Sequence, residues 1–269
     1  VNDAGDIVGG YSYAPTSTHG FVVSGADASF TDLGPQRTRG VSQDGLLAVG
    51  GVSVEGGTQV AGVWTRAAGA PWPSAGTPLL DVGGVPQSTG VAFAVATIPT
   101  EGVTVIAGVP LPARPVYWES SDGTWTAPGR LLPVPAGYAT TVNSIMGISA
   151  TGDIAGQLND PSNTSLAVVW RRVARSYVID VLPRASGYDI ARVRSISPDG
   201  TILAGNVRQT VKGKQILASA FWTRDANGVY TVRLLPSLTG SYGVEGAVYG
   251  VTVVGGQVRA VGTSPGLNG

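Results

Sequence analysis

Three tyrosines recur at one position of a repeated loop motif, and their chemistry suits ligand binding. Tyr138, Tyr188 and Tyr242 each follow a Leu-Pro pair and a glycine, and they lie 50 to 54 residues apart. Tyrosine combines a flat apolar ring with a hydroxyl, so it can stack on a sugar or pack in a protein interface. The alternative is that each ring packs against a neighbouring structural element with its hydroxyl bonded to a loop carbonyl.

Two asparagines belong to the same predicted surface. Asn163 begins an Asn-Thr-Ser sequon, and we expect the segments Gln157 to Ser165 and Asn206 to Gln215 to be long loops. Loops carried on a rigid scaffold often hold binding residues. We therefore predict a ligand- or partner-binding face that consists of Tyr138, Tyr188, Tyr242, Asn163 and Asn206.

The remaining polar residues do not form a recognisable catalytic or metal-binding set. His19 is the only histidine and there is no cysteine, which excludes a thiolate site and a multi-histidine metal site. Aspartates occur one or two per repeat, fewer than a calcium ion requires, and they stabilise tight turns without an ion. They are Asp3, Asp6, Asp44, Asp153 and Asp199. We expect no cofactor, no metal and no enzymatic activity; a hydrolase or lyase with carboxylates at a central channel is the less favoured alternative.

The elements that must carry these residues are short antiparallel strands. The stretch Ile196 to Gly205 contains two apolar runs around Asp199-Gly200, and these residue types tolerate the positive φ of a hairpin turn. Related stretches are Val1 to Gly9, Val41 to Gly50, Ile98 to Gly108, Ile148 to Gly156 and Val251 to Gly262. A tryptophan closes a later strand of four repeats at intervals of 52 or 54 residues, namely Trp64, Trp118, Trp170 and Trp222. We expect these rings to be core between repeats.

Each repeat thus holds four strands in about 40 to 55 residues, which is the size of one β-propeller blade. No segment shows an apolar stripe at helical spacing. We predict an all-β protein whose residues 1–269 form a single β-propeller domain of four-stranded antiparallel blades. The most favoured count is six blades, with five complete outer hairpins and one reduced or incomplete blade.

Composition limits the class of partner. The 17 basic residues are balanced by 17 acidic ones, so neither nucleic acid nor an anionic membrane surface is favoured. The uncharged run 82–100 is interrupted by Pro86 and Pro99, and we expect no transmembrane segment.

The segments VNDAGDIVGGYS, HGFVVS and FTDLG within residues 1–34 resemble the bacterial HAF repeat, and SPDGTILAG is similar to the blade hairpin of WD40-like and TolB-like β-propellers. The HAF resemblance implies an exported, periplasmic or cell-surface repeat protein with no assigned catalytic residues. We therefore expect a non-catalytic exported scaffold that binds a protein partner or serves as an accessory subunit of an envelope assembly. A carbohydrate-binding propeller that uses the three tyrosines is the alternative.

Overall fold

The computed structural model consists of β-strands and their connections. It describes residues 2–14, 17–85, 89–110, 114–136, 138, 142–159, 164–236 and 246–263. No helix occurs among these residues, and hence none that is long and apolar enough to cross a membrane. The described strands form six antiparallel sheets in which sequence neighbours pair with one another. This arrangement confirms the predicted all-β propeller of about six blades.

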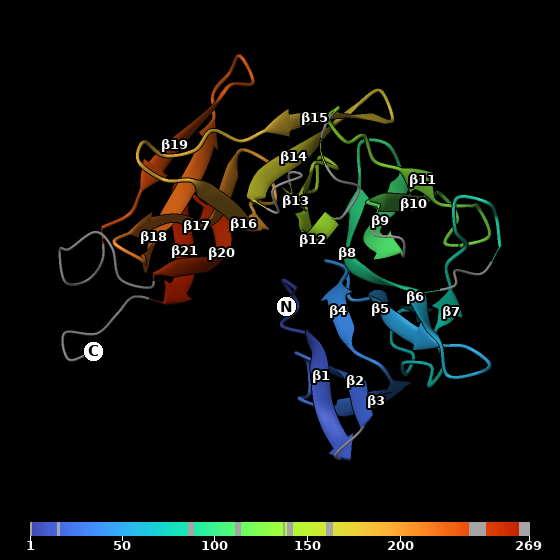
Figure 1. Cartoon of the computed structure of the whole chain (residues 1–269). Coiled ribbons are helices and arrows are strands. Elements are labelled where there is room, and N and C mark those ends of the chain that lie inside the picture. Colours follow the sequence, from blue (N-terminus) through green and yellow to red (C-terminus); the bar gives the residue numbers. More distant parts are fainter. Residues whose placement is uncertain are drawn as a thin grey trace. The chain divides into compact units, whose positions relative to one another are not determined.

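The chain folds into two compact units. Residues Val1–Leu132 form unit 1, which is drawn in blue to green in Figure 1. Its first sheet contains β1 (Ile7–Ala14), β2 (Ser17–Val23) and β3 (Phe30–Pro35). Its second sheet contains β4 (Thr38–Val41), β5 (Leu47–Ser53), β6 (Gln59–Thr65) and β7 (Thr77–Pro78). Its third sheet contains β8 (Gly90–Ile98), β9 (Val103–Pro110), β10 (Val116–Ser120) and β11 (Arg130–Leu131).

Pro133–Gly269 form unit 2, drawn in yellow-green to red in Figure 1. One sheet contains β12 (Val142–Ile148), β13 (Ile154–Asn159), β14 (Ser165–Val173) and β15 (Ser176–Val181). The next contains β16 (Ile190–Ile196), β17 (Ile202–Val211), β18 (Lys214–Arg224) and β19 (Tyr230–Leu234). The last contains β20 (Ala247–Val254) and β21 (Gln257–Thr263). The single-domain organisation stays a prediction.

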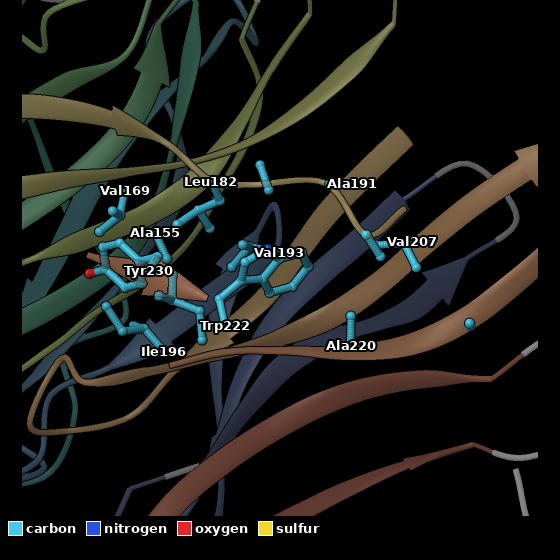
Figure 2. Close-up of a cluster of buried hydrophobic side chains, with 14 residues drawn as sticks. Ala155, Val169, Leu182, Ala191, Val193, Ile196, Val207, Ala220, Trp222 and Tyr230 are labelled. Carbon is cyan, nitrogen blue, oxygen red and sulfur yellow. The ribbon is translucent and has the colours of Figure 1, made fainter. Parts of the chain in front are cut away.

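Three of the repeated tryptophans, Trp64, Trp118 and Trp222, lie in buried clusters that join two sheets, as predicted. Trp64, Trp118, Trp170 and Trp222 are at most 2% exposed. The indole N–H of Trp222 donates to the carbonyl of Pro183, at the end of the preceding sheet, over 2.8 Å. Figure 2 shows Trp222 within the cluster that also contains Ala155 and Val169 of the preceding sheet. The indole thus joins two sheets through both packing and a hydrogen bond.

A β-bulge recurs in the first strand of five sheets, and it explains why the repeated stretches end in glycine. In β16 the bulge falls at Arg194, between the pairs Val193↔Gly205 and Ser195↔Ala204. A Cβ on Gly205 would collide with the carbonyl oxygen of Arg192. The corresponding bulge residues elsewhere are Arg39, Phe93, Met146 and Tyr249. This glycine is therefore required by a close backbone approach and not by the hairpin turn.

The hairpin aspartates divide into two groups. Asp199 accepts hydrogen bonds from the backbone N–H and the hydroxyl of Thr201, as predicted for a turn former. Asp153 follows its turn glycine instead, and it accepts the Arg172 N–H over 2.9 Å and pairs with Arg224 of the next sheet over 3.1 Å. Burial raises the pKa of Asp153 and outweighs these two interactions. The turn-forming interpretation was thus incomplete, because this carboxylate joins two sheets.

Unit 1 contains the same device. Asp6 accepts the Gly25 N–H of its own sheet over 2.9 Å and lies 3.7 Å from the guanidinium of Arg66 in the next sheet. Asp6, like Asp153, is almost completely buried. The two units therefore use one carboxylate–arginine pair at corresponding positions.

Candidate functional site

The structure places the predicted tyrosines in separate connections. Tyr188 is half-buried and packs against the cluster around Trp222, and Tyr138 is half-buried in the connection before β12. Tyr242 and Asn163 lie outside the described residues. The binding role of these residues stays a prediction.

The Leu-Pro part of the tyrosine motif has a role in packing. Leu182 is buried and its N–H donates to the carbonyl of Ala167, while the Pro183 carbonyl accepts the indole N–H of Trp222. Leu132 and Pro133 repeat this arrangement, with Trp170 as the donor. The Leu-Pro recurrence is therefore explained by the fold.

The prediction that Asn206 to Gln215 form a long loop is wrong. These residues continue β17 and β18 as a long hairpin, which turns at Lys212 and Gly213 with φ values of 49° and 77°. Two successive residues with positive φ suit a two-residue hairpin, and this turn chemistry is less evident in Lys-Gly than in Asn-Gly. Asn206 is consequently a strand residue, only 3% exposed, and its Oδ1 has no hydrogen-bond partner.

Asn206 lies in a group of arginines that the sequence-based prediction missed. Arg192 of β16 is directly opposite Asn206 in the strand register, and Arg208 lies two residues further along β17. Opposed residues and residues two apart share one face of a sheet. The three side chains therefore leave the sheet on the same side.

That side of the sheet faces β20. Ile202 and Ala204 share the face, by the alternation of a strand, and they pack against Val248 and Val251 of β20. Arg194, at the bulge of β16, lies over the ring of Tyr249 in β20, 5.9 Å from its centroid. We call the group of Arg192, Arg194, Arg208, Asn206 and Tyr249 the arginine seam.

The arginine seam carries the positive charges of Arg192, Arg194 and Arg208. Burial lowers the pKa of Arg192, and the nearby charges of Arg208 and Arg194 lower it further. The Nε atoms of Arg194 and Arg208 are buried without a hydrogen-bond partner. Arg208 makes one neutral contact, from Nη1 to Gln215 Oε1 at 3.3 Å. Within the described residues, no carboxylate forms an ion pair with these three arginines.

This arrangement can bind an oxyanion. Guanidinium groups supply planar pairs of N–H donors that match carboxylate and phosphate oxygens. The Nε–H groups of Arg194 and Arg208 keep donor capacity that the described part of the protein does not use. A sequence signal was present, because Arg37-x-Arg39 recurs as Arg192-x-Arg194 at an offset of 155 residues.

A second surface feature, an open groove, gives weaker evidence for a binding site. An open groove of about 440 Å³ lies beside β15 and the hairpin that precedes β19, lined by Arg171, Asp180 and Tyr230 among others. Arg171 and Asp180 pair with each other, so their charges are largely compensated. Burial, followed by the charge of Asp153, raises the pKa of Tyr230 to about 12. The described residues contain no cluster of three or more side chains that could hold a metal ion.

Solved structures similar to this chain are β-propellers. TolB from Acinetobacter baumannii matches with a TM-score of 0.52 and 12% identity, over 86% of this chain and 52% of that one. This chain thus spans about half the length of that protein. A putative TolB from Agrobacterium tumefaciens gives a TM-score of 0.52 at 14% identity, over 97% and 91% of the two chains. The β-propeller domain of the Trilobed protease from Pyrococcus furiosus gives 0.50 at 10% identity, over 97% and 74%.

At these identities the likeness establishes the fold alone, and it confirms the similarity to TolB-like propellers at that level. No protein-family model matches the sequence, and no curated protein matches it. Membership of the HAF-repeat family therefore stays a prediction, as do a protein partner and a carbohydrate ligand.

The expectation of a non-catalytic scaffold is corrected by other matches of the same kind. They include a putative 6-phosphogluconolactonase from Bacteroides uniformis and a periplasmic gluconolactonase from Pseudomonas aeruginosa, at 10% and 15% identity and TM-scores of 0.43. These matches transfer no activity to this chain. They show that proteins named as enzymes are among its structural neighbours, so the lack of a catalytic motif did not justify the conclusion that the protein is not an enzyme.

Proposed function

We propose that this protein is a β-propeller that binds an anionic small molecule at the arginine seam. The observation that carries the proposal is the convergence of Arg192, Arg194 and Arg208 on one side of β16 and β17 without a compensating carboxylate among the described residues. A bound carboxylate or phosphate would offset the mutual repulsion of the three cations.

The buried orphan atoms support the same site. The Nε–H groups of Arg194 and Arg208 lack acceptors in the protein, and an oxyanion would supply acceptors for them.

An exported location is part of the proposal. It is supported by the resemblance of residues 1–34 to the HAF repeat. The names of the matched proteins, which include TolB and a periplasmic gluconolactonase, accord with it.

Calorimetric titration with inorganic phosphate at low ionic strength tests the site. We expect saturable binding by the wild type and a Kd at least about tenfold weaker in Arg192→Gln and in Arg208→Gln, since each substitution removes one charge-assisted donor. Arg259→Gln is the matched control, because Arg259 is an exposed arginine of β21 outside the arginine seam. Binding that is absent from the wild type, or equally weakened in the control, would contradict the proposal.

A further inference from the structure

Tyr249 is the member of the arginine seam that a simple oxyanion would not need. It occupies the bulge of β20, the position that Arg194 occupies in β16. Although it belongs to the first strand of its sheet, Tyr249 is 55% exposed. A tyrosine ring with this much exposed surface can pack against a further group.

The contact with Arg194 fixes the ring beside the cations. The guanidinium carbon of Arg194 lies 5.9 Å from the ring centroid, within the range of a cation–π interaction. Such a contact uses one part of the ring, and the exposed fraction of Tyr249 leaves further surface open to a second group. An anion bound to Arg192, Arg194 and Arg208 would therefore lie next to an exposed aromatic surface.

From this juxtaposition, and resting on the proposed function, we infer that the arginine seam binds an oxyanion attached to a ring, with one face of that ring packed on Tyr249. Two kinds of molecule share this chemistry: an aromatic acid or phosphate, and a cyclic sugar acid or phosphate. The aromatic ring presents a flat face and the sugar ring an apolar C–H face, and either can pack on a tyrosine. Asn206 Oδ1, which lacks a donor in the protein, would suit the hydroxyl of a hydroxylated ligand.

Three probes distinguish these sources in calorimetric titrations of the full chain: methyl phosphate, phenyl phosphate and glucose 1-phosphate. We expect at least one of the ring-borne phosphates to bind about tenfold more tightly than methyl phosphate. A gain confined to phenyl phosphate identifies an aromatic ligand, and a gain confined to glucose 1-phosphate identifies a sugar ligand. Equal Kd values for all three probes would overturn the inference.

Substitution of the ring separates stacking from charge. Tyr249→Ala should abolish the advantage of the ring-borne probe while methyl phosphate binds as in the wild type, and Tyr249→Phe should retain the advantage. Persistence of the advantage in Tyr249→Ala would contradict the inference even if anion binding is real. If methyl phosphate does not bind to the wild type, the proposed function itself is contradicted. An unchanged thermal transition in Tyr249→Ala shows that the exposed substitution has not unfolded the protein.

Discussion

Units 1 and 2 carry corresponding arginines on corresponding strands, and they differ in what surrounds them. In unit 1, Arg39 occupies the bulge of β4 and lies over Phe93 of the next sheet, 5.6 Å from the ring centroid. In unit 2, Arg194 occupies the bulge of β16 and lies over Tyr249 of the next sheet at 5.9 Å. The scaffold of strand, bulge and cation–π contact is thus common to both units.

The second strands differ. Counted from the glycine opposite the bulge, Asn206 and Arg208 of β17 correspond to Gly51 and Ser53 of β5. Unit 1 therefore has two arginines at this place, and both are exposed. Unit 2 has three half-buried arginines and a buried amide. The two units therefore share their backbone geometry here, and of the two only unit 2 combines half-buried arginines with a buried amide.

The largest expected effect concerns the shared scaffold. Gly205→Ala and Gly50→Ala each force a Cβ against the carbonyl oxygen of the bulged strand, Arg192 and Arg37 respectively. We expect each to lower the free energy of unfolding by about 3 kcal/mol in denaturant titrations, since the backbone cannot give way as a flexible side chain can. Gly83→Ala, where the Cβ would meet only the Asp81 side chain, is the control. A large loss of unfolding free energy for only one of the two substitutions would contradict the structural equivalence of the bulges in units 1 and 2.

The next effect concerns the carboxylates that join sheets. Asp153→Ala removes the partner of Arg224 and the acceptor of the Arg172 N–H, and we expect a loss of about 2 kcal/mol in unfolding free energy. Asp6→Ala should behave similarly in unit 1. Asp199→Ala, which loses only turn hydrogen bonds, should cost about 1 kcal/mol. Equal losses for Asp153 and Asp199 would show that the ion pair adds nothing.

A gain-of-function substitution tests whether a third arginine is sufficient to create an anion site in unit 1. Ser53→Arg places a third arginine in unit 1 at the position of Arg208. We expect calorimetry to detect a second phosphate-binding event, weaker than the first because Gly51 has no side-chain amide to donate a hydrogen bond. An unchanged stoichiometry would show that Asn206 or the burial of the unit 2 arginines is indispensable.

The smallest effect is a pH dependence of opposite sign at two aspartates. Burial raises the pKa of Asp153, so the folded state binds this proton more tightly than the unfolded state, and its contribution to stability rises as the pH falls from neutrality through that raised pKa. Burial also tends to raise the pKa of Asp199, but hydrogen bonds from Ser197 and Thr201 lower it overall. The contribution of Asp199 is therefore complete above its unfolded pKa and is lost as the pH falls through its lowered folded pKa.

Unfolding curves of Asp153→Asn and Asp199→Asn between pH 7 and pH 3 measure both trends. Relative to Asp153→Asn, the wild type should gain stability on acidification. Relative to Asp199→Asn, it should lose stability. Parallel curves for the two variants would contradict the assignment of one aspartate to a buried pair and the other to a turn.

The architecture of this protein can be predicted from its sequence. Asp199-Gly200 and its counterparts specify hairpins through local turn chemistry, and the even spacing of Trp64, Trp118, Trp170 and Trp222 marks the blade repeat. The first signal is local and the second is a regular spacing along the chain, so both are visible without coordinates.

Which polar side chains lie close together depends on the tertiary structure. Arg192 and Arg208 share one face of β16 and β17, and that face packs against β20, whose Tyr249 lies against Arg194. The same holds for Asp153, whose partner Arg224 belongs to the next sheet. Turn propensity could not distinguish it from Asp199, because the difference lies in long-range packing between sheets and not in the local hairpin.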